Sequence, residues 1–319
     1  MKYTLTRNLN ALAAGMSFLE GIFSKKVTVH GMPPAVGIEL TNFCNLNCPE
    51  CSSGSGMMTR QRGFMSDELF DKIIIELRPF IYNLNLYFQG ESMLHPHFFT
   101  LLDKCNGIHT TLSTNGHFLT AENSQKIAGS GLKKIIISLD GMDSETYSLY
   151  RVNGDFRSVM EGIENICSAR QKAGSDLKIV IQFLVNRYNE SQISAVRKFA
   201  AGMKVSLSLK SMQIINSRSH ETWVPADDKF SRYRKTNGRF EIKGNLKNRC
   251  ARLWFNPVIT WDGKILPCCF DKDAGYVMGD INKESFRQVW NGPEYRQFRR
   301  SLLNDRLSIP ICGNCTGGL

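Results

Sequence analysis

The sequence predicts an α/β fold in which six strands alternate with helices between residues 35 and 211. The strand candidates are rich in Ile, Val and Leu without strict alternation, as in a parallel sheet covered on both faces. They are residues 35–41, 84–88, 108–113, 133–139, 177–185 and 204–210. The helix candidates fall between them: 66–78, 97–105, 120–129, 155–173 and 190–202. This order predicts either a doubly wound sheet or an incomplete barrel, and both place chemistry at the carboxyl ends of the strands.

Length and composition are those of an ordinary globular protein. The 319 residues favour about two domains. No run of 18 or more apolar residues occurs, so no transmembrane segment is expected, and residues 1–7 lack the apolar region of a secretion signal. The ten cysteines include clusters of the form C-x3-C-x2-C and C-x-x-C, which favour metal binding in a reducing compartment over disulfides. We therefore expect a cytoplasmic protein.

A basic stretch dominates the net charge of +11. Residues 229–252 hold nine Lys or Arg and a single acid, Glu241. The stretch is either a solvated basic face beside a negatively charged cofactor, which we favour, or a site for an anionic partner. The interleaved aromatics, Phe230, Tyr233 and Phe240, match no known nucleic-acid module, so no nucleic-acid partner is expected.

An amphipathic helix is predicted over residues 8–24. Its apolar residues recur at three- and four-residue steps: Leu9, Leu12, Met16, Leu19 and Phe23. Packing of this face on the main domain or on a partner is favoured over binding to a membrane surface.

Three cysteines directly follow the first predicted strand. Cys44, Cys48 and Cys51 form a C-x3-C-x2-C loop. An iron–sulfur cluster usually takes four cysteines. Three thiolates on one loop leave one iron open, as catalytic metal sites keep a position free for a ligand, so the loop predicts a catalytic cluster.

Polar turns follow the next three strands. They are Gln89-Gly90-Glu91-Ser92, Ser113-Thr114-Asn115-Gly116 and Ser138-Leu139-Asp140-Gly141. One such turn is ordinary turn chemistry, but several at the same end of one sheet predict a pocket for a polar ligand. Gly90 would let the backbone approach that ligand, and Glu91 could accept hydrogen bonds from an ammonium group.

Together the cysteine loop and these turns resemble the radical S-adenosylmethionine (radical SAM) superfamily over roughly residues 35–211. The resemblance implies a partial (β/α)6 TIM-like barrel. It implies a [4Fe-4S] cluster on Cys44, Cys48 and Cys51 whose open iron binds the amino and carboxylate groups of S-adenosylmethionine (SAM). It also implies that an electron from a donor such as flavodoxin or ferredoxin drives cleavage of SAM to a 5′-deoxyadenosyl radical, which takes a hydrogen atom from the substrate.

The resemblance also assigns the residues that contact SAM. Gln89, Gly90 and Glu91 match the turn that binds the methionine amino group, although Gln89 replaces the usual first glycine. The other matching positions are Ser113 and Asn115 in the third-strand turn, Ser138 and Asp140 near the ribose, and Arg151 facing the SAM carboxylate. Glu50 stands where an aromatic residue commonly precedes the third cysteine, so the adenine contact departs from the family pattern.

A second cysteine set, Cys250, Cys268, Cys312 and Cys315, resembles the SPASM/Twitch auxiliary-cluster domains of radical SAM enzymes. The set lacks the three further cysteines of a full SPASM domain, which predicts one auxiliary [4Fe-4S] cluster rather than two. Structural zinc is the alternative, because four thiolates also make a closed zinc site. The spacing Gly263-x4-Cys selects Cys268 over Cys269. The predicted organisation is a helical lead-in (1–34), a radical SAM core (35–211), a basic linker (212–249) and a small C-terminal auxiliary-cluster domain (250–319).

Three functions fit these features. The first is dehydrogenation of a sugar-like or other small-molecule alcohol, with the second electron passed to the auxiliary cluster and Asp271 as a candidate base, although this carboxylate could equally serve a turn. The alternative is maturation of a ribosomal peptide by crosslinking or epimerisation, which the short lead-in before residue 35 disfavours. A non-catalytic iron–sulfur protein in electron transfer or sensing is the third, and the SAM-pocket turns argue against it.

Overall fold

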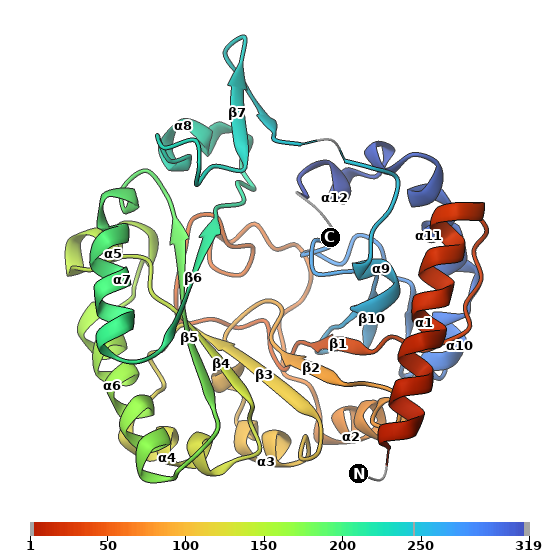
Figure 1. Ribbon diagram of the computed structural model, residues 1–319, viewed down its shortest axis with the longest axis horizontal. Helices are drawn as coiled ribbons and strands as arrows, with labels where there is room; N and C mark the ends of the chain where they lie inside the picture. The colour runs from red at the N-terminus through yellow and green to blue at the C-terminus, as the bar shows by residue number, and fades with distance from the viewer. Residues whose placement is uncertain (1–2, 245, 316–319) are drawn as a thin grey trace.

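A curved parallel sheet forms the centre of the computed structural model, which describes residues 3–244 and 246–315. Six strands lie in chain order across it: β1 (Ala35–Ile38), β2 (Asn83–Leu86), β3 (His109–Thr114), β4 (Lys134–Ser138), β5 (Lys178–Val185) and β6 (Ser206–Ser211). Each pairs in parallel with the next. Helices cover the outside of this sheet (Figure 1). The arrangement is that of a partial TIM barrel, which confirms the predicted fold class.

The helices of this region lie where the strand–helix alternation predicts them, with one addition. They are α2 (Asp67–Leu77), α3 (Phe98–Asp103), α4 (Ala121–Gly129), α5 (Ser144–Tyr150), α6 (Phe156–Lys172) and α7 (Ile193–Gly202). Ser66 caps α2 as expected, because its side chain accepts a hydrogen bond from the Leu69 N–H. The short α5 is the unexpected element, and it carries the chain from Asp140 to Arg151.

The C-terminal strands extend the same sheet. β9 (Val258–Ile259) pairs in parallel with β1, and β10 (Lys264–Leu266) and β11 (Gly279–Asp280) follow it in antiparallel order. The helices around them are α9 (Arg252–Phe255), α10 (Phe286–Trp290), α11 (Pro293–Asn304) and α12 (Pro310–Gly313). One apolar core runs through both regions. Residues 316–319 of the predicted C-terminal domain lie outside the described residues.

The stretch predicted as a basic linker contains its own structure. After the short α8 (His220–Trp223), β7 (Tyr233–Thr236) and β8 (Arg239–Ile242) form a hairpin that projects from the barrel in Figure 1. The hairpin turn is Asn237-Gly238, and both residues have positive φ, 50° and 78°. Asn-Gly is the strongest short-range signal for a two-residue hairpin turn, and it was present in the sequence.

The N-terminal helix α1 (Thr4–Ser24) forms as predicted but presents the opposite face to the domain. Its buried residues are Asn10, Ala14, Ser17 and Gly21. The Asn10 amide donates to the Met32 carbonyl at 3.0 Å and accepts from the Met32 N–H at 2.8 Å. The leucine stripe therefore does not pack on the main domain, because the small residues and Asn10 on the other face dock there instead. Packing of the stripe on a partner, the other surface expected for it, stays a prediction. No helix in the described ranges has the length and apolar character needed to span a membrane.

Candidate active site

The three loop cysteines lie directly beyond the carboxyl end of β1. Cys48 is buried, and Cys44 and Cys51 are half-buried with free thiols. Burial raises the pKa of Cys44 to about 12 and also raises that of Cys48. Because metal ligation requires thiolates, the Cys44 and Cys48 thiols would ionise only against a strong positive charge, which an iron site supplies.

Hydrogen bonds join the Gln89-Gly90-Glu91 turn after β2 to residues on either side of the cysteine loop. Gly90 has φ +76°, and a Cβ there would lie 2.6 Å from the carbonyl oxygens of Thr41 and Phe43. Its N–H donates to the Ser53 hydroxyl at 3.0 Å, and the Glu91 N–H donates to the Phe43 carbonyl at 2.8 Å. Only glycine fits a backbone this close to the loop.

The carboxylate of Glu91 is fully buried and held by backbone groups. It accepts hydrogen bonds from the N–H of Asn115 at 2.7 Å and of Met93 at 3.2 Å. Burial raises its pKa to about 6 against these hydrogen bonds. A buried carboxylate with this pKa gains from a cationic partner, so the site suits the ammonium group assigned to it from the sequence.

Asn115 joins the turn after β3 to the cysteine loop. Its side-chain amide donates to Asn45 Oδ1 at 2.7 Å and lies 3.9 Å from Cys44 Sγ. Ser113 is half-buried within β3, and Ser138 is buried at the end of β4. All three therefore come to the same end of the sheet as the cysteines.

A buried ion pair lies on the other side of the loop. The guanidinium of Arg151 contacts the Asp140 carboxylate at 2.5–2.6 Å and lies 3.7 Å from Cys48 Sγ. Burial raises the pKa of Asp140, and the Arg151 charge acts against that rise. The second Asp140 oxygen accepts from the Leu184 N–H at 2.7 Å. Arg151 thus places positive charge beside a predicted cluster ligand.

Glu50 has a structural partner that the sequence did not suggest. Its carboxylate accepts hydrogen bonds from the backbone N–H groups of Ile215 at 2.6 Å and Asn216 at 3.2 Å. The residue therefore ties the cysteine loop to the segment after β6. It also lines an open cavity with Asn47, Pro49, Met57 and Ser219, among others. The departure from the aromatic pattern at this position is thus matched by a different, polar use of the residue.

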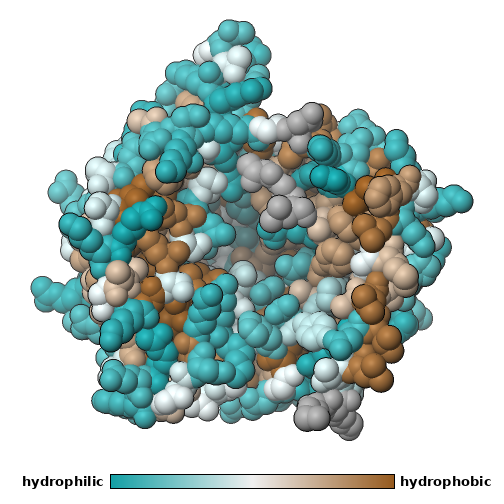
Figure 2. Space-filling view, viewed as in Figure 1, coloured by the Kyte–Doolittle hydropathy of each residue, from teal (hydrophilic) through white to brown (hydrophobic). Residues whose placement is uncertain are grey.

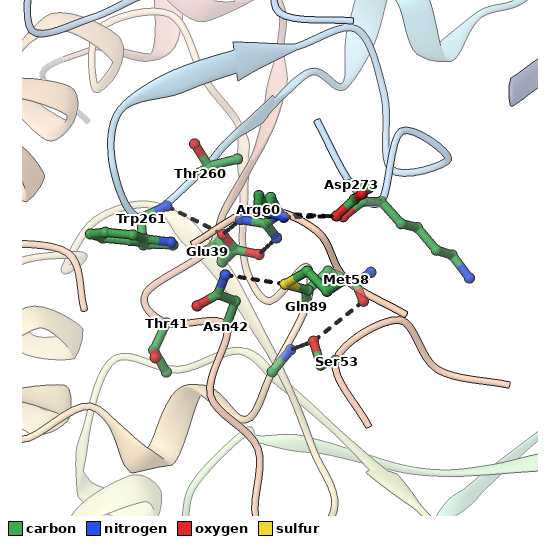
Figure 3. Close-up of polar contacts among 12 residues, drawn as sticks. Glu39, Thr41, Asn42, Ser53, Met58, Arg60, Gln89, Thr260, Trp261 and Asp273 are labelled. Carbon is green, nitrogen blue, oxygen red and sulfur yellow. Dashed lines mark hydrogen bonds and ion pairs between the residues drawn. The ribbon is translucent and has the colours of Figure 1, made fainter. Parts of the chain in front are cut away.

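A polar network that the sequence did not suggest links the segments before and after the cysteine loop to the C-terminal region (Figure 3). Glu39 is fully buried in the chain leaving β1 and pairs with Arg60, whose Nη1 lies 2.6 Å from Oε2. The backbone N–H of Trp261 donates to the same Glu39 oxygen at 3.3 Å, and Asp273 accepts from the Thr59 N–H at 2.8 Å. An acid inside the apolar run Ala35–Leu40 was the available signal.

The four C-terminal cysteines converge on one closed cavity. Cys250, Cys268, Cys312 and Cys315 all line it, together with apolar side chains and two arginines. Cys269 is not among the lining residues, and its sulfur lies 3.5 Å from Nη1 of Arg252. This geometry favours Cys268 over Cys269 as the fourth ligand, in line with the assignment by spacing.

Arg306 is a buried cation in the lining of this cavity. Its side chain is buried, and its Nη1 donates to the Arg249 carbonyl at 3.1 Å. Among the described residues, its Nε and Nη2 have no hydrogen-bond partner. A buried cation with unpartnered donors is costly and fits a negatively charged thiolate-bound group in the cavity.

Asp271 does not have the surroundings expected of a catalytic base. Its two carboxylate oxygens accept hydrogen bonds from the N–H groups of Gly275 at 2.8 Å and Tyr276 at 2.9 Å. These are the contacts of a loop cap. Its role as a proton acceptor stays a prediction, with the structural role favoured by the contacts.

Comparison with protein families gives the class of this protein. The model of the radical SAM superfamily matches residues 38–200, and that of an iron–sulfur cluster-binding domain, SPASM, matches residues 250–316. The chain belongs to the radical SAM superfamily and carries a SPASM domain. It is an enzyme that uses SAM and a [4Fe-4S] cluster to which SAM binds, and it has a domain for auxiliary iron–sulfur clusters.

The curated relatives include maturases, AdoMet-dependent heme synthases and a cofactor-modifying protein. The chain is 31% identical over 302 residues to the mycofactocin maturase MftC of Mycolicibacterium smegmatis, covering 87% of this chain and 74% of the relative. Among solved structures it resembles SuiB of Streptococcus suis bound to S-adenosylmethionine (17% identity, TM-score 0.65, 90% and 73% covered). It also resembles BtrN in complex with AdoMet and 2-DOIA (18% identity, TM-score 0.58, 90% and 94% covered). At these identities the two structures show the fold alone.

Proposed function

We propose that this radical SAM enzyme is a maturase that modifies a ribosomally made peptide or protein. The observation that carries the proposal is similarity along 87% of the chain to a mycofactocin maturase. SuiB, which shares the fold, is known in a complex with the precursor peptide SuiA. This proposal replaces dehydrogenation of a small alcohol as the preferred function, because the similarity to a maturase extends over 87% of the chain.

The barrel opening supports a substrate of this size. The cavity beside Glu50 is open to solvent and is lined by residues of the cysteine loop and of the segment after β6. Figure 2 shows a hollow at the centre of this face. The β7–β8 hairpin adds the exposed basic side chains Arg234, Lys235 and Arg239, of which Lys235 pairs with Glu221 at 2.5 Å and Arg234 with Glu241 at 3.7 Å. An extended peptide with acidic residues would complement this charge.

We assign the SAM-binding cluster to Cys44, Cys48 and Cys51, whose bound iron supplies reductive cleavage of SAM and a radical able to take hydrogen from a C–H bond. Glu91 would hold the amino group of the methionine moiety. Arg151, kept in place by Asp140, would face its carboxylate. These residues come from several strand ends, so the barrel orients the ligand before reaction.

We assign the auxiliary cluster to Cys250, Cys268, Cys312 and Cys315. Arg306 would balance part of its negative charge, and the apolar lining would exclude water. The hydrogen bonds of Glu39 and Arg60 hold the C-terminal region against the chain on either side of the cysteine loop. These contacts would keep the distance between the two cluster sites constant. The external electron donor, such as flavodoxin or ferredoxin, stays a prediction.

The substrate class is tested with the anaerobically reconstituted enzyme, SAM and dithionite. Short peptides encoded beside the gene are compared with a set of sugar-like alcohols by mass spectrometry. We expect peptide-dependent formation of 5′-deoxyadenosine together with loss of two hydrogen atoms from the peptide, or deuterium uptake from D2O if the reaction is epimerisation. Oxidation of an alcohol with every peptide inert would contradict the proposal and restore the dehydrogenase reading.

A further inference from the structure

The outward face of α1 carries an unusually regular apolar stripe. Six large side chains on it are each 51–83% exposed: Leu5, Leu9, Leu12, Met16, Leu19 and Phe23. Their spacing alternates strictly between four and three residues, which is the a/d pattern of a coiled-coil seam rather than the wider face of a helix packed on a core. Brown side chains gather along the edge of Figure 2 where Figure 1 places α1.

The apolar stripe can pair with the same stripe of a second copy that runs in the opposite direction. The six positions are symmetric about Ala14, so that in an antiparallel pair Leu5 would oppose Phe23, Leu9 would oppose Leu19 and Leu12 would oppose Met16 of the second copy. Each of these pairs joins an a position to a d position, as antiparallel packing of two such seams requires. A single helix therefore supplies both halves of one interface.

The centre of the stripe permits close approach. Ala13 and Gly15 flank the point of symmetry, and a Cβ at Gly15 would meet nothing within 4 Å. Beside the seam lie the six positions Thr6, Asn8, Ala13, Gly15, Glu20 and Ile22. Helices that lie on membranes carry Lys and Arg beside their apolar face, and none of these six positions holds one, although Lys25 and Lys26 follow the last stripe residue. The charge pattern thus favours a protein partner over lipid.

The opposite face fixes the helix in place. Phe18 packs edge-on against Trp254 and Phe255, with ring centroids 5.6 and 5.3 Å apart. A Cβ on Gly21 would lie 3.1 Å from Trp254. The stripe is therefore held rigidly outward, and little conformational entropy is lost when it is covered.

We propose that two copies of this chain associate through α1 as an antiparallel helix pair, with a two-fold axis that crosses the exposed face of the helix at the level of Ala14. The six exposed side chains offer on the order of 700 Å² per copy, close to the ~800 Å² per partner of a standard interface. The same patch on both copies makes a closed, isologous contact, the commonest kind in homo-oligomers. None of the stripe residues lines either cysteine site.

The test is the mass of the reconstituted holoenzyme in detergent-free buffer, measured by light scattering after anaerobic gel filtration. We expect twice the 36.1 kDa chain for the unaltered protein and a single chain for Leu12→Glu. Iron content and SAM cleavage should be unchanged in this variant. The matched control is Ile75→Glu on α2, another side chain that is 74% exposed, which should leave the dimer intact.

The register is tested by mixing variants. Leu12→Glu and Met16→Lys should each be monomeric alone and should form a mixed dimer together, because antiparallel pairing sets position 12 against position 16. A monomeric unaltered protein, or a dimer that survives Leu12→Glu, would overturn the proposal. Failure of the mixture to pair would overturn the antiparallel register. Binding of the monomer to phosphatidylcholine vesicles, abolished by Leu12→Glu, would assign the stripe to a membrane instead.

Discussion

The two cysteine sites differ in how they are assembled and in what surrounds them. Cys44, Cys48 and Cys51 lie on one loop among strand ends that bring Glu91 and the Asp140–Arg151 pair beside them. The auxiliary cysteines come from positions between 250 and 315 and enclose a cavity with mostly apolar walls. The first arrangement suits a metal that meets an exchangeable polar ligand, and the second suits a group that stays bound. The following substitutions test this difference.

The largest effect is expected at the loop. Cys48→Ala should abolish formation of 5′-deoxyadenosine and lower the iron content from about eight to about four per chain, since each cubane holds four irons. Anaerobic reconstitution followed by iron analysis and chromatography measures both. Cys105→Ala, at a buried free cysteine away from both sites, is the control. Continued SAM cleavage by Cys48→Ala would refute the assignment of the loop.

Breaking the buried ion pair should have the next largest effect. Arg151→Ala leaves Asp140 buried and unpaired, which typically costs about 3–5 kcal/mol. We expect a clear drop in the free energy of unfolding and weaker SAM binding, measured by denaturant titration and equilibrium dialysis. Arg157→Ala, at an exposed position on α6, should change neither. Unaltered SAM affinity in Arg151→Ala would remove this residue from the SAM site.

The auxiliary site should respond in its electronic properties. Arg306→Leu removes a buried positive charge from the cavity wall and should lower the reduction potential of the auxiliary cluster by on the order of tens of millivolts. Arg306→Lys, which keeps the charge, should shift it less. A potentiometric titration followed by EPR separates this from a structural role. A shift in the loop cluster alone would mean that Arg306 acts elsewhere.

The buried carboxylate of Glu91 predicts that SAM binding at the loop site depends on pH. The pKa of Glu91 is raised to about 6, so ionising it costs stability as the pH rises through this value, and a bound ammonium group would recover that cost. SAM affinity should therefore fall as the pH drops below about 6, when the carboxylate becomes protonated. Equilibrium dialysis between pH 5 and 8 measures the fall. In Glu91→Gln the dependence should disappear.

The smallest catalytic effect is expected at Asp271. Asp271→Ala removes the acceptor for two backbone N–H groups and should lower stability by about 1–3 kcal/mol. SAM cleavage and product formation should persist once the variant is folded. A variant that still makes 5′-deoxyadenosine but loses product formation would instead identify Asp271 as the base.

The sequence was informative where a local pattern has one physical meaning. The cysteine spacing and the turns after β2, β3 and β4 predicted which residues meet, because the carboxyl ends of parallel strands lie together. The Ser66 cap was predicted for a similar reason. The Asn237-Gly238 turn carried an equally clear signal, but the surrounding basic charge was interpreted as a linker.

Other features depend on tertiary contacts that periodicity does not reveal. The apolar stripe of α1 faces outward, because the helix docks on the domain through Asn10 and Gly21 on its other face. The pairing of Glu39 with Arg60 joins parts of the chain that show no mutual signal in sequence. The partners of Glu50 lie more than 160 residues away at Ile215 and Asn216. Such contacts follow from the assembled sheet rather than from any one segment.

The contrast between the two sites is tested most directly by EPR of the dithionite-reduced holoenzyme with and without SAM. We expect two [4Fe-4S] signals, of which SAM alters only the one that Cys48→Ala removes. The auxiliary signal should be unchanged by SAM, because four thiolates close its coordination. A single cluster signal with bound zinc, or SAM-induced changes in both signals, would contradict the assignment of an open loop site and a closed auxiliary site.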